Sequence, residues 1–333
     1  MIDLLRKMIA IPSLTREEGA VADFLENWLR EHGQEPRRSG NNLWCVKGHG
    51  PAVLMDAHID TVRPAATWQR DPFTPTLEEG RLYGLGSNDD GGSVVAMTHA
   101  FLQAQPRAHT LVLSLSAEEE ICGKNGIEAA LPLIEAEVGP ITCGIMGEPT
   151  QMRMAVAEKG LMVLDCIARG VSGHAARNEG VNAIYEALDD IIWFREHGMQ
   201  VTQIQAGTQH NVLPDHCQFV VDVRTTGSNQ AVLDAIQEGV RCEVSARSTR
   251  LNGSSIAFSH PLVQAARELG IPTFSSPTLS NQAVCSFPTV KIGPGDSARS
   301  HTADEYICPE EVEAAVPLYL KLLETYENLE QRI

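Results

Sequence analysis

The residues that could carry out chemistry begin with a His-x-Asp sequence at the end of a short apolar run. The run 52–55 predicts a buried strand, and side chains two positions apart in an extended chain point to the same side. His58 and Asp60 can therefore face one point, where a neutral imidazole would bind a metal ion and the carboxylate would orient the ring. Because His-x-Asp is a common sequence, a surface histidine beside an acid is the alternative interpretation of these two residues.

A glycine-rich segment, 84–92, contains two adjacent acids, Asp89 and Asp90, and precedes a helix predicted over 94–103. Glycine-rich loops that bind phosphate carry a lysine, whereas this segment has two acids and no lysine. A loop that directs a carboxylate toward a cation fits this composition better than a phosphate cradle or a plain turn.

Further acids follow two other apolar runs. A strand predicted over 110–115 leads into Glu118, Glu119 and Glu120, and a strand predicted over 141–146 leads into Glu148. Acids at the end of a buried strand are costly unless water or a cation compensates their charge. A solvated helix start is the competing interpretation, since acids suit the first turn of a helix.

These acids and His58 share one position relative to the elements that must hold them. Apolar strands that alternate with helices predict an α/β sheet, in which ligands collect at the carboxyl ends of the strands. The candidates at or just after such ends are His58, Asp89, Glu119, Glu120 and Glu148. This agreement is stronger evidence for a metal site than any one motif.

Two helices are predicted before the first strand. Leu5, Met8 and Ile9 have helical spacing in the first. Residues 15–18 have the pattern of a capping box, which predicts Thr15 as the N-cap of a second helix that ends at Gly33.

From about residue 158 the pattern changes to strand, helix, strand, strand, helix, strand, at 161–168, 181–193, 201–205, 217–223, 230–240 and 244–250. This βαββαβ order predicts a compact two-layer unit. Helices predicted near 261–269 and 310–327 complete the chain. We therefore expect a split catalytic domain, 1–157 and 258–333, with residues 158–257 inserted.

The composition excludes several classes of partner. The 333 residues include 43 acids and 26 bases, and this negative balance repels phosphate backbones, so nucleic acid is not expected. The 8 cysteines form no CxxC pair, which favours buried thiols in a reducing compartment. With no signal-peptide pattern and no apolar run that could span a bilayer, we expect a cytoplasmic protein without a membrane partner.

Taken in order, the motifs make the chain similar to the co-catalytic zinc aminoacylases and exopeptidases, which include acetylornithine deacetylase, succinyl-diaminopimelate desuccinylase and glutamate carboxypeptidases. The matching motifs are weak singly and specific together: Ala57-His58-Ile59-Asp60, Tyr83-Gly84 with Asp89, Glu119-Glu120, Gly147-Glu148-Pro149, Ser172-Gly173-His174-Ala175, 211–215 and 301–305. The resemblance covers essentially the whole chain. It implies an α/β, mixed-sheet catalytic domain like that of the zinc exopeptidases, with an inserted ferredoxin-like domain for lid movement and dimerisation.

The resemblance also implies two divalent metal ions. Asp89 would bridge them, His58 and Glu148 would complete one site, and Glu120 and His301 would complete the other. Zinc is expected, and cobalt or manganese would suit the same nitrogen and oxygen ligands.

Other roles follow from the same resemblance. Glu119 would be the general base, and Asp60 would orient His58. His174 would act in the active site of the partner subunit of a homodimer formed through the inserted domain. Asn211 and Arg224 would hold the substrate's carboxylate, with Arg299 as a further candidate.

Local departures from the family lie around these residues and leave every predicted ligand in place. Leu85 replaces a usual arginine, Gly91 replaces a usual lysine, and residues 279–282 replace a Gly-x-x-Asp sequence. We expect these changes to affect the substrate pocket and not the catalytic groups. The peptide bond between Asp89 and Asp90 is expected to be cis, as in the family.

The expected activity is deacylation of an N-acyl-L-amino acid, with N-acetyl-L-ornithine of arginine biosynthesis as the first candidate substrate. N-Succinylornithine and N-acylcitrulline are alternatives, as is a dipeptidase or aminoacylase activity on the same fold. A non-catalytic relative that binds a metal or ligand is the alternative from another class, and the presence of Glu119 argues against it.

Overall fold

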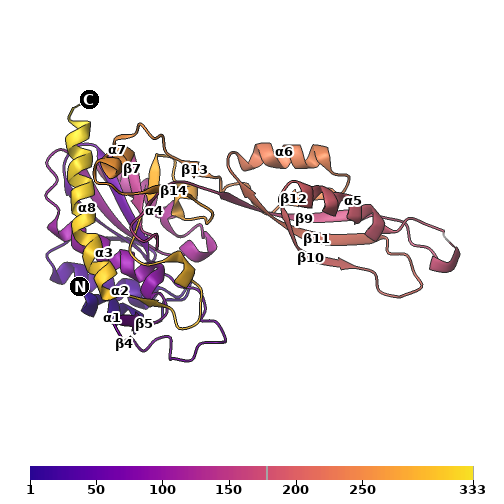
Figure 1. Ribbon diagram of the computed structural model, residues 1–333, viewed down its shortest axis with the longest axis horizontal. Coiled ribbons are helices and arrows are strands. Elements are labelled where there is room, and N and C mark those ends of the chain that lie inside the picture. The colour runs from indigo at the N-terminus through magenta and orange to yellow at the C-terminus, as the bar shows by residue number, and fades with distance from the viewer. Residues whose placement is uncertain (178, 333) are drawn as a thin grey trace. The chain divides into compact units, whose positions relative to one another are not determined.

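The computed structural model describes residues 1–177 and 179–332 and divides into two compact units (Figure 1). The first unit comprises Met1–Ala157, Ser255–Ser276 and Ser280–Ile333, and the second comprises Glu158–Ser254 and Pro277–Leu279.

A 9-stranded mixed sheet forms the centre of the first unit. Its strands are β1 (Arg37–Ser39), β2 (Asn42–Gly48), β6 (Thr110–Ser116), β3 (Ala52–His58), β7 (Ile141–Met146), β15 (Thr289–Lys291), β8 (Met154–Glu158) and β13 (Ser254–Ser255), in that spatial order, with β14 (Thr273–Ser276) beside β8. The pairs β3–β6, β3–β7 and β7–β15 are parallel. Every residue of β3 and β6 is buried, as expected for parallel strands that are covered on both faces.

Helices cover both faces of this sheet (Figure 1). One face, which includes Met55 of β3, packs against α1 (Ile2–Ile9), α2 (Gly19–Glu31), α3 (Gly92–Gln103), α7 (Pro261–Glu268) and α8 (Pro309–Glu330). The other face, which includes the adjacent Leu54, packs against α4 (Ile127–Val138). A 3-stranded sheet of β4 (Thr76–Glu78), β5 (Arg81–Tyr83) and β16 (Tyr306–Ile307) lies apart from the main sheet.

The predicted capping box at residue 15 is wrong. Helix α2 begins at Gly19 with Glu18 as its N-cap residue, and no side chain caps it. Thr15 instead donates its hydroxyl to Asp60 Oδ2 at 2.9 Å, because tertiary contact with the end of β3 takes the place of local capping.

The second unit is a two-layer βαββαβ fold. Its antiparallel sheet has the order β10 (Gln200–Ala206), β11 (His216–Thr225), β9 (Gly160–Arg169), β12 (Glu243–Ala246). Both α5 (Ala183–Glu196) and α6 (Asn229–Gly239) pack on one face, where a single apolar cluster includes Phe194, Phe219 and Ile236. The expected fold class, a mixed-sheet α/β unit with an inserted ferredoxin-like unit, is confirmed.

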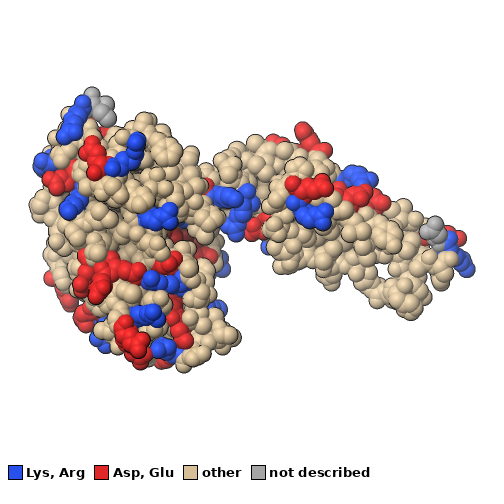
Figure 2. All heavy atoms as spheres, in the orientation of Figure 1, with Lys and Arg blue, Asp and Glu red and all other residues tan. Residues whose placement is uncertain are grey.

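The distribution of charge and thiols agrees with an ordinary globular surface and interior. On the face that Figure 2 shows, basic side chains are interspersed with acidic ones and do not form a continuous stripe. None of the eight cysteines, all within the described residues, forms a disulfide bond. In the ranges 1–177 and 179–332, no helix has both the length and the apolar character needed to cross a membrane.

Candidate metal centre

The carboxyl ends of three parallel strands of the first unit meet at one edge of its sheet. β3 ends at His58, β6 ends at Ser116 shortly before Glu119, and β7 ends at Met146 shortly before Glu148. Asp89 lies in the turn that precedes α3, and His301 lies in the loop that precedes β16. The sheet therefore brings together residues that are far apart in the sequence.

His58 lies at the centre of this group. Its Nε2 atom is 3.1 Å from Asp89 Oδ1 and 4.0 Å from Glu119 Oε2. Ligand atoms of His58, Asp89 and Glu120 all lie within 4.8 Å of one another, as do those of His58, Glu119 and Glu148. Either set is close enough to surround a cation.

His301 joins the opposite side of the group. Its Nε2 atom lies 2.9 Å from Glu120 Oε2 and 3.6 Å from Asp89 Oδ2. The structure thus brings all five predicted ligands together, with Asp89 between His58 and His301. Glu119 is also at ligand distance, so the geometry alone does not separate a base from a ligand.

Asp60 holds three parts of the site in place. The side chain is fully buried, and its carboxylate accepts the backbone N–H of Glu119 at 3.0 Å and that of Glu120 at 3.2 Å. His58 Nδ1 lies 3.0 Å from the backbone oxygen of Asp60 and 3.4 Å from Oδ1. Asp60 therefore contacts the imidazole of His58 and also fixes the start of the acidic segment.

The electrostatics show why this cluster suits cations. Burial raises the pKa of Glu119 and of Glu148 well above their usual range, and neighbouring acids add to the rise. Although burial opposes it, hydrogen bonding to Asp60 and Asp89 raises the pKa of His58 well above its ordinary value. A buried group of carboxylates with two imidazoles is stabilised when divalent cations neutralise the acids, and these nitrogen and oxygen donors suit such ions.

Two further residues support the centre and were not assigned from the sequence. Asn88 donates its side-chain N–H groups to the backbone oxygen of Asp296 at 3.1 Å and to Ser300 Oγ at 3.3 Å. Glu305 is buried beside the same segment, and burial together with the charge of Asp89 raises its pKa to about 8. The only sequence signal for them was their closeness to Asp89 and His301. The peptide bond between Asp89 and Asp90 is cis, as the resemblance implied.

The candidate substrate residues of the second unit lie near its surface. Arg224, on β11, donates from Nε and Nη2 to the carboxylate of Asp222 at 2.9 and 3.2 Å. Asn211 is exposed in the loop between β10 and β11. His174 is also exposed, and its Nδ1 accepts the backbone N–H of Ala176 at 3.2 Å.

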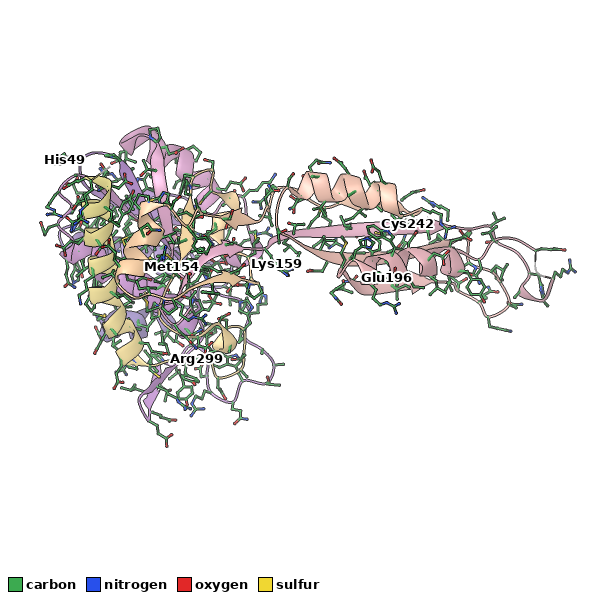
Figure 3. The ribbon with its side chains drawn as sticks, turned by 45° about the horizontal axis from the view of Figure 1, so that its top comes forward. His49, Met154, Lys159, Glu196, Cys242 and Arg299 are labelled. Carbon is green, nitrogen blue, oxygen red and sulfur yellow. The ribbon has the colours of Figure 1, made fainter. Side chains whose placement is uncertain are left out.

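Arg299 is placed differently from the other substrate candidates. It lies in the first unit (Figure 3), as the last residue of a 3-10 helix, Ser297–Arg299, two residues before His301. Its guanidinium donates to both carboxylate oxygens of Glu311 at 2.7 and 3.2 Å and lies over the ring of Tyr306 at 4.6 Å. This geometry favours a role in fixing the loop to the start of α8 over direct contact with a substrate.

Comparison with known proteins agrees with this fold and site. Residues 54–325 match the family described as Peptidase family M20/M25/M40. The match spans more than half of the chain, so the protein belongs to this family and is a metal-dependent amidohydrolase.

Relatives match over nearly the whole chain. A succinyl-diaminopimelate desuccinylase of Cereibacter sphaeroides is 27% identical over 377 residues, covering 98% of this chain and 98% of that protein. An acetylornithine deacetylase of Erwinia tasmaniensis is 27% identical over 359 residues, covering 92% of each. The solved structure of the Bacillus subtilis YXEP protein, described as a dinuclear metal binding peptidase of the M20 family, has a TM-score of 0.75 at 17% identity, covering 99% of this chain and 97% of that one.

Proposed function

We propose that the protein hydrolyses the amide bond of an N-acyl-L-amino acid with the help of two divalent metal ions. Zinc is the first candidate metal. The observation that carries this proposal is the convergence of His58, Asp89 and Glu120 within 4.8 Å at the carboxyl edge of the sheet. Glu148 and His301 complete the ligand set, and cobalt or manganese would suit the same donors. The similarity to a dinuclear M20 peptidase supports a pair of ions.

The residues of the first unit have different roles in the proposed hydrolysis. When bound, the two ions acidify the attacking water and polarise the scissile carbonyl. Glu119 takes the proton of the water and delivers it to the leaving amine. Asp60 accepts the N–H groups of both Glu119 and Glu120, and this anchor lets the two adjacent side chains take different tasks.

The second unit supplies substrate recognition in this proposal. Asp222 accepts from Nε and from one N–H of Nη2 of Arg224, which leaves Nη1 and the second N–H of Nη2 for another carboxylate. A guanidinium held in this way is oriented in advance and can form two parallel hydrogen bonds with the substrate's carboxylate. Asn211 lies in the loop before β11, at the other end of that strand from Arg224, and adds an amide donor in this proposal.

Replacement of Arg224 by lysine should raise KM for the N-acyl amino acid ~10- to 10²-fold, because lysine cannot reproduce the fork and loses charged hydrogen bonds. The measurement is steady-state kinetics on the metal-loaded enzyme, with kcat expected to change much less. Arg169→Lys is the matched control, since Arg169 forms a similar two-point contact with Glu243 on the same sheet. An unchanged KM in Arg224→Lys would argue against the substrate role.

We propose N-acetyl-L-ornithine, an intermediate of arginine biosynthesis, as the substrate. The similarity to an acetylornithine deacetylase supports this assignment. The similarity to a succinyl-diaminopimelate desuccinylase favours a succinyl group as the second candidate. Both candidates are N-acylated amino acids with a free carboxylate, so both fit the proposed contact with Arg224.

A substrate panel tests the proposal. The zinc-loaded enzyme would be assayed with N-acetyl-L-ornithine, N-succinyl-L-ornithine, N-acetyl-L-citrulline, N-succinyl-L,L-diaminopimelate and a dipeptide. We expect the highest kcat/KM for the acetylated ornithine. Preference for a succinylated compound would replace the acyl assignment, preference for the dipeptide would replace the deacylase assignment, and failure to cleave any would contradict both.

The proposed enzyme is a homodimer formed through the second unit. Tyr185, Leu188 and Ile192 lie at helical spacing on α5 and are 67%, 45% and 42% exposed. Ile204, on the edge strand β10, is 59% exposed. Exposed apolar side chains grouped in this way mark protein interfaces.

We propose the cytoplasm as its location. The cysteines form no disulfide bond in the described structure, and thiols persist in reducing compartments. The free thiols are consistent with the proposed role in amino-acid biosynthesis, which would take place in the reducing cytoplasm.

A further inference from the structure

The Glu305 carboxylate is buried against the segment that carries Asp89. Its side chain is 2% exposed. Oε2 accepts the backbone N–H of Gly86 at 3.0 Å, and Oε1 accepts those of Asn88 at 2.8 Å and Asp89 at 2.9 Å. One carboxylate therefore fixes three amides of this segment, including that of Asp89 itself.

A second set of bonds joins the same segment to the loop of His301. The side chain of Asn88 donates to Asp296 O and Ser300 Oγ, and its Oδ1 accepts the backbone N–H of Asp296 at 2.9 Å. Gly295 permits this close approach, because a Cβ atom at that position would lie 2.3 Å from Asn88 Oδ1. The segment 86–89 is thus bonded to residues on both sides of His301: Asp296 and Ser300 before it, and Glu305 after it.

A carboxylate at this place is costly, which suggests a specific role. Burying a carboxylate away from water is unfavourable, and the side chain of Glu305 is almost fully buried. Three backbone N–H groups compensate part of that cost and give the acid a fixed orientation. A neutral side chain of similar size would fill the space at lower cost but could not accept three N–H groups in this way.

We propose that Glu305 is a positioning residue that aims the Asp89 carboxylate between His58 and His301 and so sets the affinity of the metal pair. This inference rests on the proposed ligand role of Asp89. Glu305 does not contact the metals or the substrate in this scheme; it acts through the backbone of residues 86–89.

The test is metal binding by Glu305→Gln. The amide keeps the size of the side chain but turns an NH₂ group toward one of the three N–H donors. We expect the affinity for the second metal ion to fall ~10- to 100-fold, as is typical when a residue that orients a metal ligand is lost. The readouts are calorimetric titration of the metal-free protein with Zn²⁺, the zinc content after dialysis and the visible spectrum of the Co²⁺-loaded protein.

Glu327→Gln is the matched control. Glu327 is also a buried acid that accepts backbone N–H groups, those of Arg107 and Ala108, but it lies beyond the start of β6, at the opposite edge of the sheet from the metal centre. The Glu327→Gln variant should be less stable than the unchanged protein but should bind metal with the same affinity. If Glu305→Gln does not fold, Glu305→Asp is used in its place. The shorter acid cannot reach all three N–H groups, so this variant should also bind the second metal ion more weakly.

The outcomes separate this inference from the proposed function. If the unchanged protein binds two zinc ions and the folded Glu305 variants bind both with unchanged affinity, Glu305 has no positioning role and the proposed function stands. If the unchanged protein binds no pair of ions, the proposed function itself fails. An equal loss of metal affinity in Glu327→Gln would assign the effect to general destabilisation and overturn the inference.

Discussion

Replacing Glu119 with alanine should lower kcat at least ~10²-fold, because the water and the leaving amine lose their proton carrier. The variant should retain both metal ions, since Glu119 is proposed to act as a base and not as a ligand. The geometry makes this test decisive, because ligand atoms of Glu119, His58 and Glu148 lie within 4.8 Å of one another. The measurement combines steady-state kinetics with the metal content of the purified variant.

The adjacent acid provides the control for this prediction. Glu118 accepts a hydrogen bond from Asn125 at 3.0 Å and belongs to neither group of candidate ligands. Glu118→Gln should therefore retain turnover and metal. Near-normal kcat in Glu119→Ala would remove the base assignment, and loss of one ion would make Glu119 a ligand.

Much of the fold could be predicted because the burial of a strand determines the pattern of apolar residues in its sequence. β3 and β6 are buried along their whole length, and the apolar runs 52–55 and 111–113 within them identify both as strands. In the second unit, burial alternates from residue to residue along β9 and β11, because helices cover one face of that sheet. The spatial order of the main sheet was not predictable in this way. β15 pairs with β7 at Thr289 and Gly144, and no local pattern encodes so distant a partner.

The candidate site was predictable to the extent that it follows the strand ends. His58, Glu120 and Glu148 follow parallel strands that the pattern identifies, so their meeting could be expected from the sheet alone. His301 lies in an irregular loop, and only the family resemblance predicted its place.

Two residues have tertiary partners that the local sequence does not reveal. Thr15 has the local pattern of a helix cap, yet it donates to Asp60, 45 residues away. Arg299 lies beside His301 in sequence, yet Glu311 of α8 takes both arms of its guanidinium. For Thr15 the tertiary partner outweighs the local pattern, so the predicted cap is wrong. The substrate role of Arg299 stays a prediction.

Replacing His174 with alanine should lower kcat ~10²- to 10³-fold if its imidazole donates to the oxyanion of the tetrahedral intermediate. The second unit holds the ring in a suitable form. Nδ1 accepts the N–H of Ala176 at 3.2 Å, which places the proton of the neutral ring on Nε2 as a donor. His174 is exposed, as a group that reaches another subunit must be.

Mixing two inactive variants tests whether His174 acts in the partner's site. In a dimer of Glu119→Ala with His174→Ala, one site would combine an intact Glu119 with an intact His174 from the other subunit. Random exchange at equal concentrations should restore about a quarter of the normal activity, since half of the dimers carry one complete site. Mixing Glu119→Ala with the double variant Glu119→Ala/His174→Ala is the control and should restore none. If labelled subunits are seen to exchange while the first mixture stays inactive, His174 does not act across the dimer.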